Sequence, residues 1–207
     1  MSGRANVSNL RLQEYAVAGI SLLLVLIMQS TSQQYDAVIS LCKDIFLKKM
    51  KDYGTAWRNL RPRSLTDQIF IKAQRIKSIE EKGQQKVEDD IRGEYVGIVN
   101  YCLIALIQIE LCNDSRMELP FEEVSELYTR HQERTKQLME DKNHDYGEAW
   151  RDMRMESLTD LILMKIFRVK QIEDNKGKTL ISEGIEANYM DMINYAVFAL
   201  IKLDRNS

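Results

Sequence analysis

The 207-residue sequence contains few of the residues that interrupt regular structure, with only 9 glycines and 2 prolines. So little glycine and proline excludes a turn-dense all-β fold and a collagen-like or low-complexity chain. Charge of one sign is also missing, because 29 Lys and Arg residues stand against 31 Asp and Glu, a net charge of -2. No basic excess is available to hold a nucleic-acid polymer by neutralising its phosphates, whereas a nucleotide-sized ligand fits this balance.

Cysteine is equally sparse. Cys42, Cys102 and Cys112 are odd in number and show no CxxC spacing, so neither a disulfide framework nor a zinc site is indicated. We expect free thiols in a reducing compartment, which predicts a cytoplasmic protein. Apolar residues make up 44% and charged residues 29% of the chain, and this balance supports a globular core rather than a disordered tail.

Long hydrophobic runs are absent apart from residues 15–28, which read YAVAGISLLLVLIM without a charge. This run is short, since a membrane-spanning helix needs about 20 residues. Three interpretations compete: a signal peptide or anchor preceded by Arg4 and Arg11, an apolar helix packed on the body, or an over-extended start with Met28 as the true first residue. The last is preferred, and residues 1–33 are treated as an N-terminal extension.

The strongest signal is an internal duplication. Residues 52–80 align with residues 145–173, and 17 of these 29 positions are identical. After one extra residue near Gly177, the match continues between residues 94–107 and 188–201. Both tryptophans and eight of the nine tyrosines occupy equivalent positions. Two copies are too few for a solenoid, which needs about three repeats, so we expect a module that packs on its own copy, like a homodimer fused into one chain.

Each copy has the pattern of three helices, because apolar residues recur at spacings of three and four. In the first copy we expect a left-handed Gly54 to end the first helix and a capping box at Ser64–Asp67 to start the second. The third helices are strongly apolar and are expected at the centre. The predicted fold class is all-α: two tandem three-helix repeats in a pseudo-twofold bundle after an apolar N-terminal helix. Its parts are residues 34–113 (repeat 1), 114–126 (linker and start of the next helix) and 127–204 (repeat 2).

The repeated motif DYGxAWRxxRxxSLTDxIxxKxxRxxxIE, followed by a helix ending in NYxxxALI, resembles the nucleotide modification associated domain, type one. The resemblance extends over nearly all of the chain from Tyr35 to Leu203, in two copies, and leaves residues 1–33 outside. It implies a nucleotide-handling protein linked to modified nucleotides in phage and bacterial systems. It implies no established catalytic residues.

The last predicted helix carries Glu183, Glu186, Asp191 and Asn194 on one face, at about 100° per residue. Oxygen ligands of this kind suit Mg²⁺ or Mn²⁺, with waters and substrate phosphates completing the shell. The pattern is similar to the acidic helix of all-α nucleoside triphosphate pyrophosphohydrolases of the MazG and dimeric dUTPase type. We therefore predict a metal site at the three carboxylates. In the alternative interpretation, Glu183 and Glu186 are solvated acids favoured by the helix dipole.

The first copy lacks most of this acidic face, so a metal site would come mainly from the second copy. Asn100 is the counterpart of Asn194 and persists. These two asparagines fit equally well as a structural amide pair at the pseudo-twofold axis. The first-copy counterparts of the three carboxylates are Asp89, Arg92 and Gly97.

Basic and aromatic residues of the repeated motif are candidates for contact with a substrate. Lysine and arginine at i, i+3 on each second helix can bind phosphate oxygens, or else form salt bridges to Asp67 and Asp160 or to the acidic helix. The DYG turn and the Trp-Arg pair after it can stack on and hydrogen-bond a nucleobase, or else pin the turn to the core. The candidates are Asp145, Tyr146, Trp150, Arg151, Lys165, Arg168 and Asn194, with Asp52, Tyr53, Trp57, Arg58, Lys72, Arg75 and Asn100 as their equivalents in repeat 1.

Two classes of function remain. The first is an Mg²⁺- or Mn²⁺-dependent nucleoside triphosphate pyrophosphohydrolase, in which Lys165 and Arg168 stabilise developing phosphoryl charge. The alternative is a non-catalytic module that binds a nucleotide or another protein. The expected partner is a nucleotide or modified nucleotide and no nucleic-acid polymer. A membrane is expected as a partner only if residues 15–28 are an anchor, and a homo-oligomer is a further hypothesis.

Overall fold

The computed structural model describes residues 30–84, 90–178 and 183–205, and within these ranges it is all-α with no strand. The apolar run at residues 15–28 lies outside the described residues. Among the helices of the described ranges, none combines the length and the apolar character that crossing a membrane requires. The elements are α2 (Thr31–Tyr53), η1 (Ala56–Asn59), α3 (Pro62–Lys82), α4 (Ile91–Glu110), α5 (Phe121–Tyr146), η2 (Ala149–Asp152), α6 (Met155–Asp174) and α7 (Ile185–Arg205).

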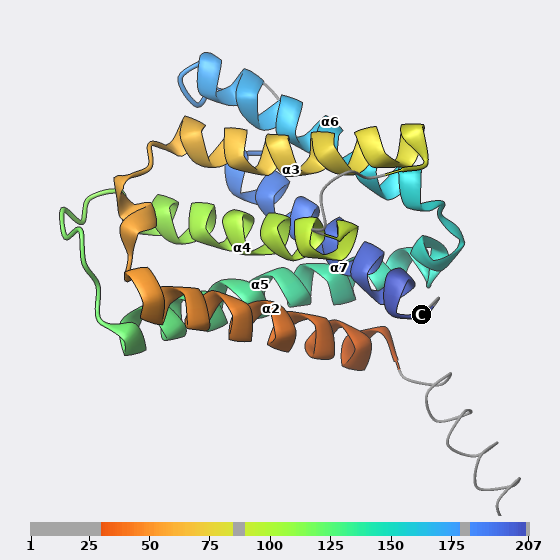
Figure 1. The fold of residues 1–207 in the computed structure, drawn as a ribbon, viewed down its shortest axis with the longest axis horizontal. Helices are drawn as coiled ribbons and strands as arrows, with labels where there is room; N and C mark the ends of the chain where they lie inside the picture. Colours follow the sequence, from red (N-terminus) through yellow and green to blue (C-terminus); the bar gives the residue numbers. More distant parts are fainter. Residues whose placement is uncertain (1–29, 85–89, 179–182, 206–207) are drawn as a thin grey trace, which may run out of the picture. The chain divides into compact units, whose positions relative to one another are not determined.

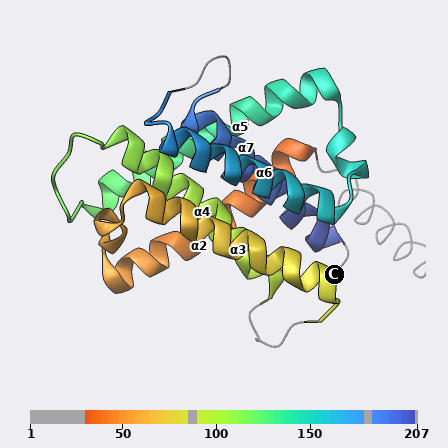
Figure 2. The ribbon, with the colours of Figure 1, turned by 90° about the horizontal axis from the view of Figure 1, so that it is seen from above.

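The chain divides after Gln34 into two units, and the second, from Tyr35 onward, holds the helical core. Its six long helices form three layers of two: α3 beside α6, α4 beside α7, and α2 beside α5 (Figure 1). Figure 2 looks down on the α3 and α6 layer, with α4 and α7 beneath it. Side-chain contacts join α2 to α5, since Phe46 and Tyr128 stack with ring centroids 4.9 Å apart.

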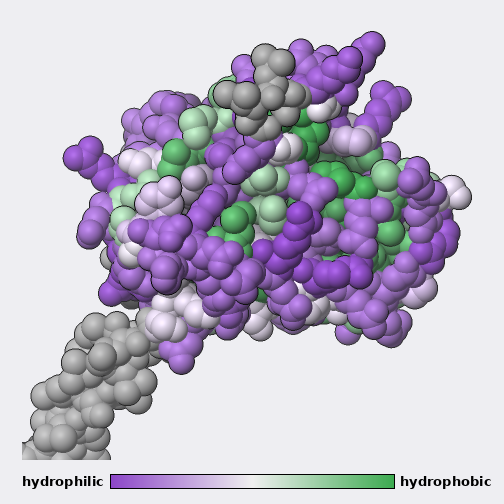
Figure 3. All heavy atoms as spheres, turned by 180° about the vertical axis from the view of Figure 1, so that it is seen from behind, coloured by the Kyte–Doolittle hydropathy of each residue, from purple (hydrophilic) through white to green (hydrophobic). Residues whose placement is uncertain are grey.

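Helices α4 and α7 occupy the middle layer because apolar residues surround them on nearly all sides. They pack against each other and run in opposite directions (Figure 1). Residues Ile98, Leu103, Met192 and Leu200 illustrate the result, since none exposes more than a trace of its surface. The outer helices have one apolar face only, and the face of the molecule in Figure 3 is accordingly covered mainly by hydrophilic side chains.

Buried tyrosines and asparagines tie the central layer to the layer of α2 and α5. The Tyr35 hydroxyl donates to Oδ1 of Asn194 over 3.0 Å, and the Tyr128 hydroxyl donates to Oδ1 of Asn100 over 2.8 Å. Tyr35 is the sequence equivalent of Tyr128, and Asn100 that of Asn194. Each hydrogen bond therefore joins one repeat to the other. The tyrosine comes from repeat 1 in the first bond and from repeat 2 in the second, and the asparagine comes from the opposite repeat.

The same exchange occurs between the central layer and the layer of α3 and α6. The hydroxyls of Tyr95 and Thr159 lie 2.8 Å apart, and those of Thr66 and Tyr189 lie 2.9 Å apart. All four side chains are buried. Polar groups removed from water cost free energy unless they are paired, so these reciprocal pairs satisfy hydroxyls that the apolar core could not accommodate alone.

The starts of the second helices differ from the expectation. Helix α3 begins at Pro62, with Arg61 as the N-cap and no side-chain cap. The predicted capping box at Ser64–Asp67 is wrong, because these residues lie within the helix and the Thr66 hydroxyl is bonded to its neighbours in the core. Proline at the first helical position lacks only an N–H that has no partner there, so it starts the helix by itself. The expected left-handed turn is present at Gly54, with φ of +60°.

A half-buried carboxylate beside each Thr–Tyr pair predicts a pH effect. Burial raises the pKa of Glu173, although the hydrogen bond that the Thr66 hydroxyl donates to it over 2.9 Å acts the other way. A raised folded-state pKa contributes stability below the unfolded-state pKa, and that contribution is lost as the pH rises through the folded-state pKa. E173Q mimics the protonated form, so its melting temperature should exceed that of the parent at pH 7 and approach it near pH 4.

The control for this prediction is E81Q, because Glu81 is exposed and should leave the difference between the two pH values unchanged. E80Q provides an internal repetition, since burial also raises the pKa of Glu80 beside Thr159. An E173Q protein that melts below the parent at pH 7 would contradict the assignment of Glu173 as a carboxylate whose charge is unfavourable in the fold.

Candidate functional site

A cavity of about 660 Å³ lies in the first repeat, between α2, η1 and α4, with one residue of α3 reaching into it. The α2 residues that line the cavity, including Lys49 and Tyr53, lie on one face of the helix, because residues four positions apart in a helix project to the same side. Gly93 and Gly97 line the cavity on the α4 side, where they contribute no side chain. The polar and aromatic residues around the cavity are Lys49, Tyr53, Trp57, Lys72, Asp90, Arg92, Glu94, Asn100 and Tyr101.

The turn after α2 positions Trp57 in the wall of this cavity. Gly54 adopts φ of +60°, a conformation that glycine takes without steric cost. The next residue is anchored, since the buried Thr55 hydroxyl donates to the Met117 carbonyl over 2.8 Å. Trp57 is consequently buried, with 8% of its surface exposed. Its indole Nε1 is buried and has no hydrogen-bond partner among the described residues, and the same holds for Trp150 Nε1 in the second repeat.

Two tyrosines, Tyr53 of α2 and Tyr101 of α4, also line the cavity. Lys72 Nζ lies 6.0 Å from the ring centroid of Tyr101. Burial, with the neighbouring Tyr101 and the charge of Asp52 in support, raises the pKa of Tyr53, which remains a neutral phenol. Tyr53 still exposes 55% of its surface, so its ring is available to a ligand.

A buried carboxylate holds the basic residues of α3 in place. Glu94 is 8% exposed and accepts hydrogen bonds from Lys72 Nζ, at 3.1 Å, and from Arg75. Lys72 reaches it by crossing directly over Gly97, where an added Cβ would lie 2.6 Å from Cε of the lysine. Arg92, another cavity residue, pairs with Asp204 at 3.1 Å.

In the second repeat, the equivalents of Lys49 and Lys72 are Lys142 and Lys165, and both bind the carboxylate of Asp191. Asp191 has a side chain only 4% exposed, and its two carboxylate oxygens lie 2.6 Å from Lys142 Nζ and 2.6 Å from Lys165 Nζ. Burial alone would lower the pKa of Lys142, but the hydrogen bond and charge of Asp191 raise it above the usual value. The predicted metal ligand Asp191 therefore bridges two ammonium groups in this structure.

The other two acids predicted to bind metal lie in different surroundings. Glu186 pairs with Arg134 at 2.7 Å on the surface, and Glu183 is exposed. Across residues 30–84, 90–178 and 183–205, no group of three His, Cys, Asp or Glu side chains is arranged to hold a metal ion. The Mg²⁺ or Mn²⁺ site at these three carboxylates stays a prediction.

The aromatic and arginine candidates of the second repeat pack against one another and against the core. Trp150 stacks on Phe198, with ring centroids 4.4 Å apart and planes at 6°, and the Arg151 guanidinium lies 4.3 Å above the Trp150 ring. Asp145 and Tyr146 are exposed, Tyr146 by 76% of its surface. In this repeat the tryptophan pins the turn to the core.

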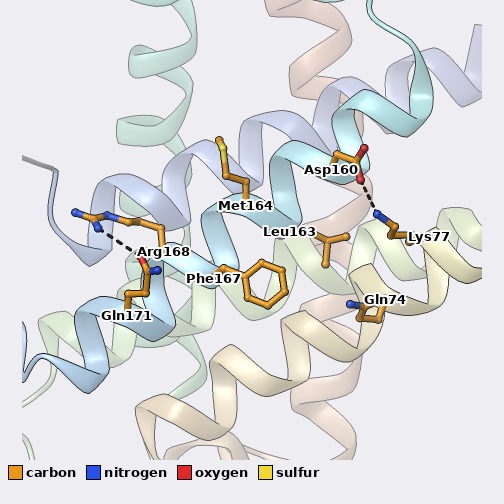
Figure 4. Close-up of a pocket in the computed structure, with 8 residues that line it drawn as sticks. All are labelled: Gln74, Lys77, Asp160, Leu163, Met164, Phe167, Arg168 and Gln171. Carbon is orange, nitrogen blue, oxygen red and sulfur yellow. Dashed lines mark hydrogen bonds and ion pairs between the residues drawn. The ribbon is translucent and has the colours of Figure 1, made fainter.

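Arginines of both repeats also serve other contacts. Arg58 bonds Gln108 and the carbonyls of Asp114 and Arg116, so it secures the segment that leads to α5. Arg168 lies with Gln171 in a shallow groove of about 490 Å³ over α3 and α6 (Figure 4). It does not join Lys165 at Asp191.

The acids of the second helices pair with lysines that do not line the cavity, and Figure 4 shows one of these pairs, Asp160 with Lys77. Asp160 binds Lys77 at 3.1 Å, and the equivalent Asp67 binds Lys170 at 2.6 Å. The alternative salt bridges of Lys72 and Lys165 to these two aspartates therefore do not form, and Lys165 bonds the acidic helix instead.

The amides of Asn100 and Asn194 are both engaged in the core. Besides accepting from a tyrosine, Asn100 donates to the Cys42 carbonyl over 3.0 Å, and Asn194 donates to the Thr135 carbonyl over 3.4 Å. Their arrangement supports a structural role, although Asn100 also forms part of the cavity wall.

Several residues that line the cavity, above all Lys49 and Glu94, were not predicted from the sequence as site residues. Lys49 is conserved between the repeats as Lys142, and that pairing was the available signal. Glu94 corresponds to Asn188, whose amide donates to the Gly184 carbonyl over 2.8 Å within its own helix. Asp52, next to the motif tyrosine, is exposed and lies outside the cavity lining.

Comparisons with curated proteins and with solved structures found no significant match. A comparison with protein families matched residues 49–109 and 142–203 to the family described as nucleotide modification associated domain 1. The two matched segments cover more than half of the chain and include the repeated motif in each copy, which confirms the resemblance drawn from that motif. The chain belongs to the family of the nucleotide modification associated domain 1.

Proposed function

We propose that the protein binds a nucleotide in the cavity of the first repeat. The observation that carries the proposal is a cavity that presents the basic side chains of Lys49, Lys72 and Arg92 together with the aromatic ring of Trp57, whose buried indole N–H has no partner among the described residues. Ligand pockets of proteins have volumes of about 300–1,000 Å³, and about 660 Å³ lies within this range. The family membership, which links the chain to nucleotide modification, supports the choice of ligand.

The aromatic residues suit the base of such a ligand. The exposed ring of Tyr53 and the neighbouring ring of Tyr101 offer faces on which a base can stack, and stacking contributes about 1–3 kcal/mol per base. The Trp57 indole is a donor only, so it would bond a carbonyl oxygen or ring nitrogen of the base. The basic residues suit the phosphates, because lysine and arginine bind phosphate oxygens by charge-assisted hydrogen bonds.

Hydrolysis of the bound nucleotide is a separate hypothesis. It rests on the likeness of the acidic helix to pyrophosphohydrolases and requires a divalent cation. The cavity itself carries two carboxylates, Asp90 and Glu94, of which Glu94 is bonded to basic side chains. Binding without catalysis accounts for the geometry of the first repeat with fewer assumptions. Release of pyrophosphate with Mg²⁺ or Mn²⁺ is the assay that separates the two functions.

We also infer that the two copies form a pseudo-twofold unit, equivalent to a dimer fused into one chain. The support comes from the bonds that recur with the repeats exchanged, such as Tyr35–Asn194 with Tyr128–Asn100. An isologous arrangement requires this kind of reciprocity. It also explains how one site can diverge, since both copies are needed for the core whereas one cavity suffices for a ligand.

The two tryptophans allow a direct test of the binding site. A panel of canonical and base-modified nucleoside mono- and triphosphates is titrated while tryptophan fluorescence and calorimetric heat are measured. We expect quenching in the parent and in W150F, which retains Trp57 at the cavity. W57F should lose the quenching and bind about fivefold more weakly, because a hydrogen bond of ordinary strength contributes about 1 kcal/mol.

W150F serves as the matched control, because its aromatic replacement lies in the equivalent turn of the other repeat. Quenching that survives in W57F and disappears in W150F would move the ligand to the second repeat. Absence of calorimetric binding for every nucleotide in the panel would contradict nucleotide binding altogether.

A further inference from the structure

Equivalent lysines of the two repeats face different groups. Lys49 corresponds to Lys142, and Lys72 corresponds to Lys165. In the second repeat, a carboxylate lies between the two ammonium groups, since Asp191 is 2.6 Å from each. In the first repeat, the counterpart of Asp191 is Gly97, which has no side chain to offer. The two lysines therefore share one carboxylate in the second repeat, whereas in the first repeat Lys72 pairs with Glu94 and no carboxylate is shared with Lys49.

The end of the flexible Lys72 side chain occupies the space that a side chain would need at Gly97. Gly97, Lys49 and Lys72 all line it. Cε of Lys72 lies 2.6 Å and Nζ 3.0 Å from the point where a Cβ atom of residue 97 would stand, so the ammonium lies directly against Gly97. Lys49 is exposed and has no ion-pair or hydrogen-bond partner within the described ranges. Lys72 is shared with Glu94, whose carboxylate approaches from α4 at 3.1 Å.

Other differences between the repeats point the same way. Arg92 lines the cavity where the second repeat has Glu186, so the first repeat exchanges a negative charge for a positive one. Ile104 lines it where the second repeat has Phe198, whose ring covers Trp150. The first repeat is consequently less filled at this location and carries a positive charge at residue 92, while Asp90 and Glu94 stand where the second repeat has the neutral Gly184 and Asn188.

We infer that an oxyanion of the ligand, a phosphate group, binds between Lys49 and Lys72 over Gly97, where the second repeat holds the carboxylate of Asp191. Asp191 thus acts as a built-in substitute for the ligand phosphate and keeps the second repeat unliganded. The site accepts a phosphate because two ammonium groups that lack a common anion gain charge-assisted hydrogen bonds when one enters. That the phosphate belongs to a nucleotide rests on the proposed function.

The test introduces the internal anion into the first repeat. G97D places a carboxylate at the position equivalent to Asp191, and the end of the flexible Lys72 side chain can shift to accommodate it. Two probes are used, inorganic pyrophosphate and the nucleoside triphosphate of the panel that binds most tightly. We expect G97D to bind each of them at least about tenfold more weakly than the parent does, because a charge-assisted contact is lost. Binding of the matching nucleoside, which has no phosphate, should change less than about threefold.

The matched control is G93D, which adds the same charge one turn earlier on the same helix, where a Cβ atom meets nothing within 4 Å. It reports the effect of a negative charge placed elsewhere in the lining of the same cavity. K49Q tests the subsite without placing a side chain at residue 97, and Lys49 is exposed, so this variant should fold. We expect K49Q to weaken pyrophosphate binding while leaving nucleoside binding unchanged.

Pyrophosphate separates this inference from the proposed function. If pyrophosphate binds to the parent and not to G97D, while no nucleoside or nucleotide shows base-dependent binding, the phosphate subsite is correct and the nucleotide is not the ligand. If nucleotides bind and quench Trp57, but G97D and K49Q bind both probes as well as G93D does, the subsite is wrong and the nucleotide proposal stands. If the parent does not bind pyrophosphate or a triphosphate, the subsite is also wrong.

Discussion

D191N is expected to lower the free energy of unfolding by about 3 kcal/mol, the lower end of the range for breaking a buried ion pair. The carboxylate of Asp191 accepts from Lys142 and Lys165 at 2.6 Å each, and its side chain is 4% exposed. An asparagine of the same shape offers one acceptor, and its NH₂ group would face the other ammonium, donor against donor. The cost stays at the lower end because the Lys142 side chain is 43% exposed and can turn towards water.

Urea unfolding of D191N and the parent measures this loss, with D160N as the control. Asp160 pairs with Lys77 on the surface, where both side chains are well exposed, so the control should change by less than about 1 kcal/mol. The same melts with Mn²⁺ examine the metal hypothesis. A metal held by Asp191 would stabilise the parent by about 2.7 kcal/mol at a hundredfold excess over the dissociation constant. D191N would then abolish this gain without destabilising the metal-free protein, which contradicts the ion-pair expectation.

The second large effect is expected for the buried amides. N194A and N100A should each lower the free energy of unfolding by about 2–3 kcal/mol, because a buried group left without its hydrogen bond costs about 1–3 kcal/mol and the truncation leaves a small cavity. In each case a tyrosine hydroxyl, that of Tyr35 or Tyr128, loses its acceptor. The two losses should be similar, because the contacts are equivalent with the repeats exchanged.

Chemical unfolding compares the two variants with N113A, whose exposed asparagine should contribute less than about 0.5 kcal/mol. A ligand-binding role for Asn100 would appear as a small loss of stability in N100A combined with a large loss of nucleotide affinity. Equal and large losses of stability in N100A and N194A would support structural amides in both repeats.

Much of the helical architecture could be predicted because its cause is local in sequence. Apolar residues at spacings of three and four positions indicated the long helices. Gly54, the residue after α2, has the left-handed conformation that is expected of a glycine at the end of a helix. The start of α3 was mispredicted for an equally local reason. Ser64–Asp67 has the pattern of a capping box, but Pro62 and the tertiary partners of Thr66 place the helix start earlier.

The candidate site was predictable in part. The repeated motif pointed to Trp57 and Lys72, which do line the cavity. It pointed with equal strength to Arg58, which the structure uses to hold the segment before α5. A repeated motif identifies the side chains that both copies retain. The direction in which each of these side chains points depends on the residues that pack beside it. No sequence pattern indicated which copy would remain open.

The sequence by itself determined the helical class, the duplication and the family, because apolar periodicity and the pairing of equivalent residues are properties of the chain read in one dimension. Only the tertiary structure decided what the charged residues do. Asp191 and Gly97 are one aligned difference among many in the sequence. In three dimensions the first is a carboxylate between two lysines, and the second is a glycine over which Lys72 crosses at the edge of a cavity. That distinction depends on which residues of separate helices lie within a few ångströms, and contacts between distant segments set it.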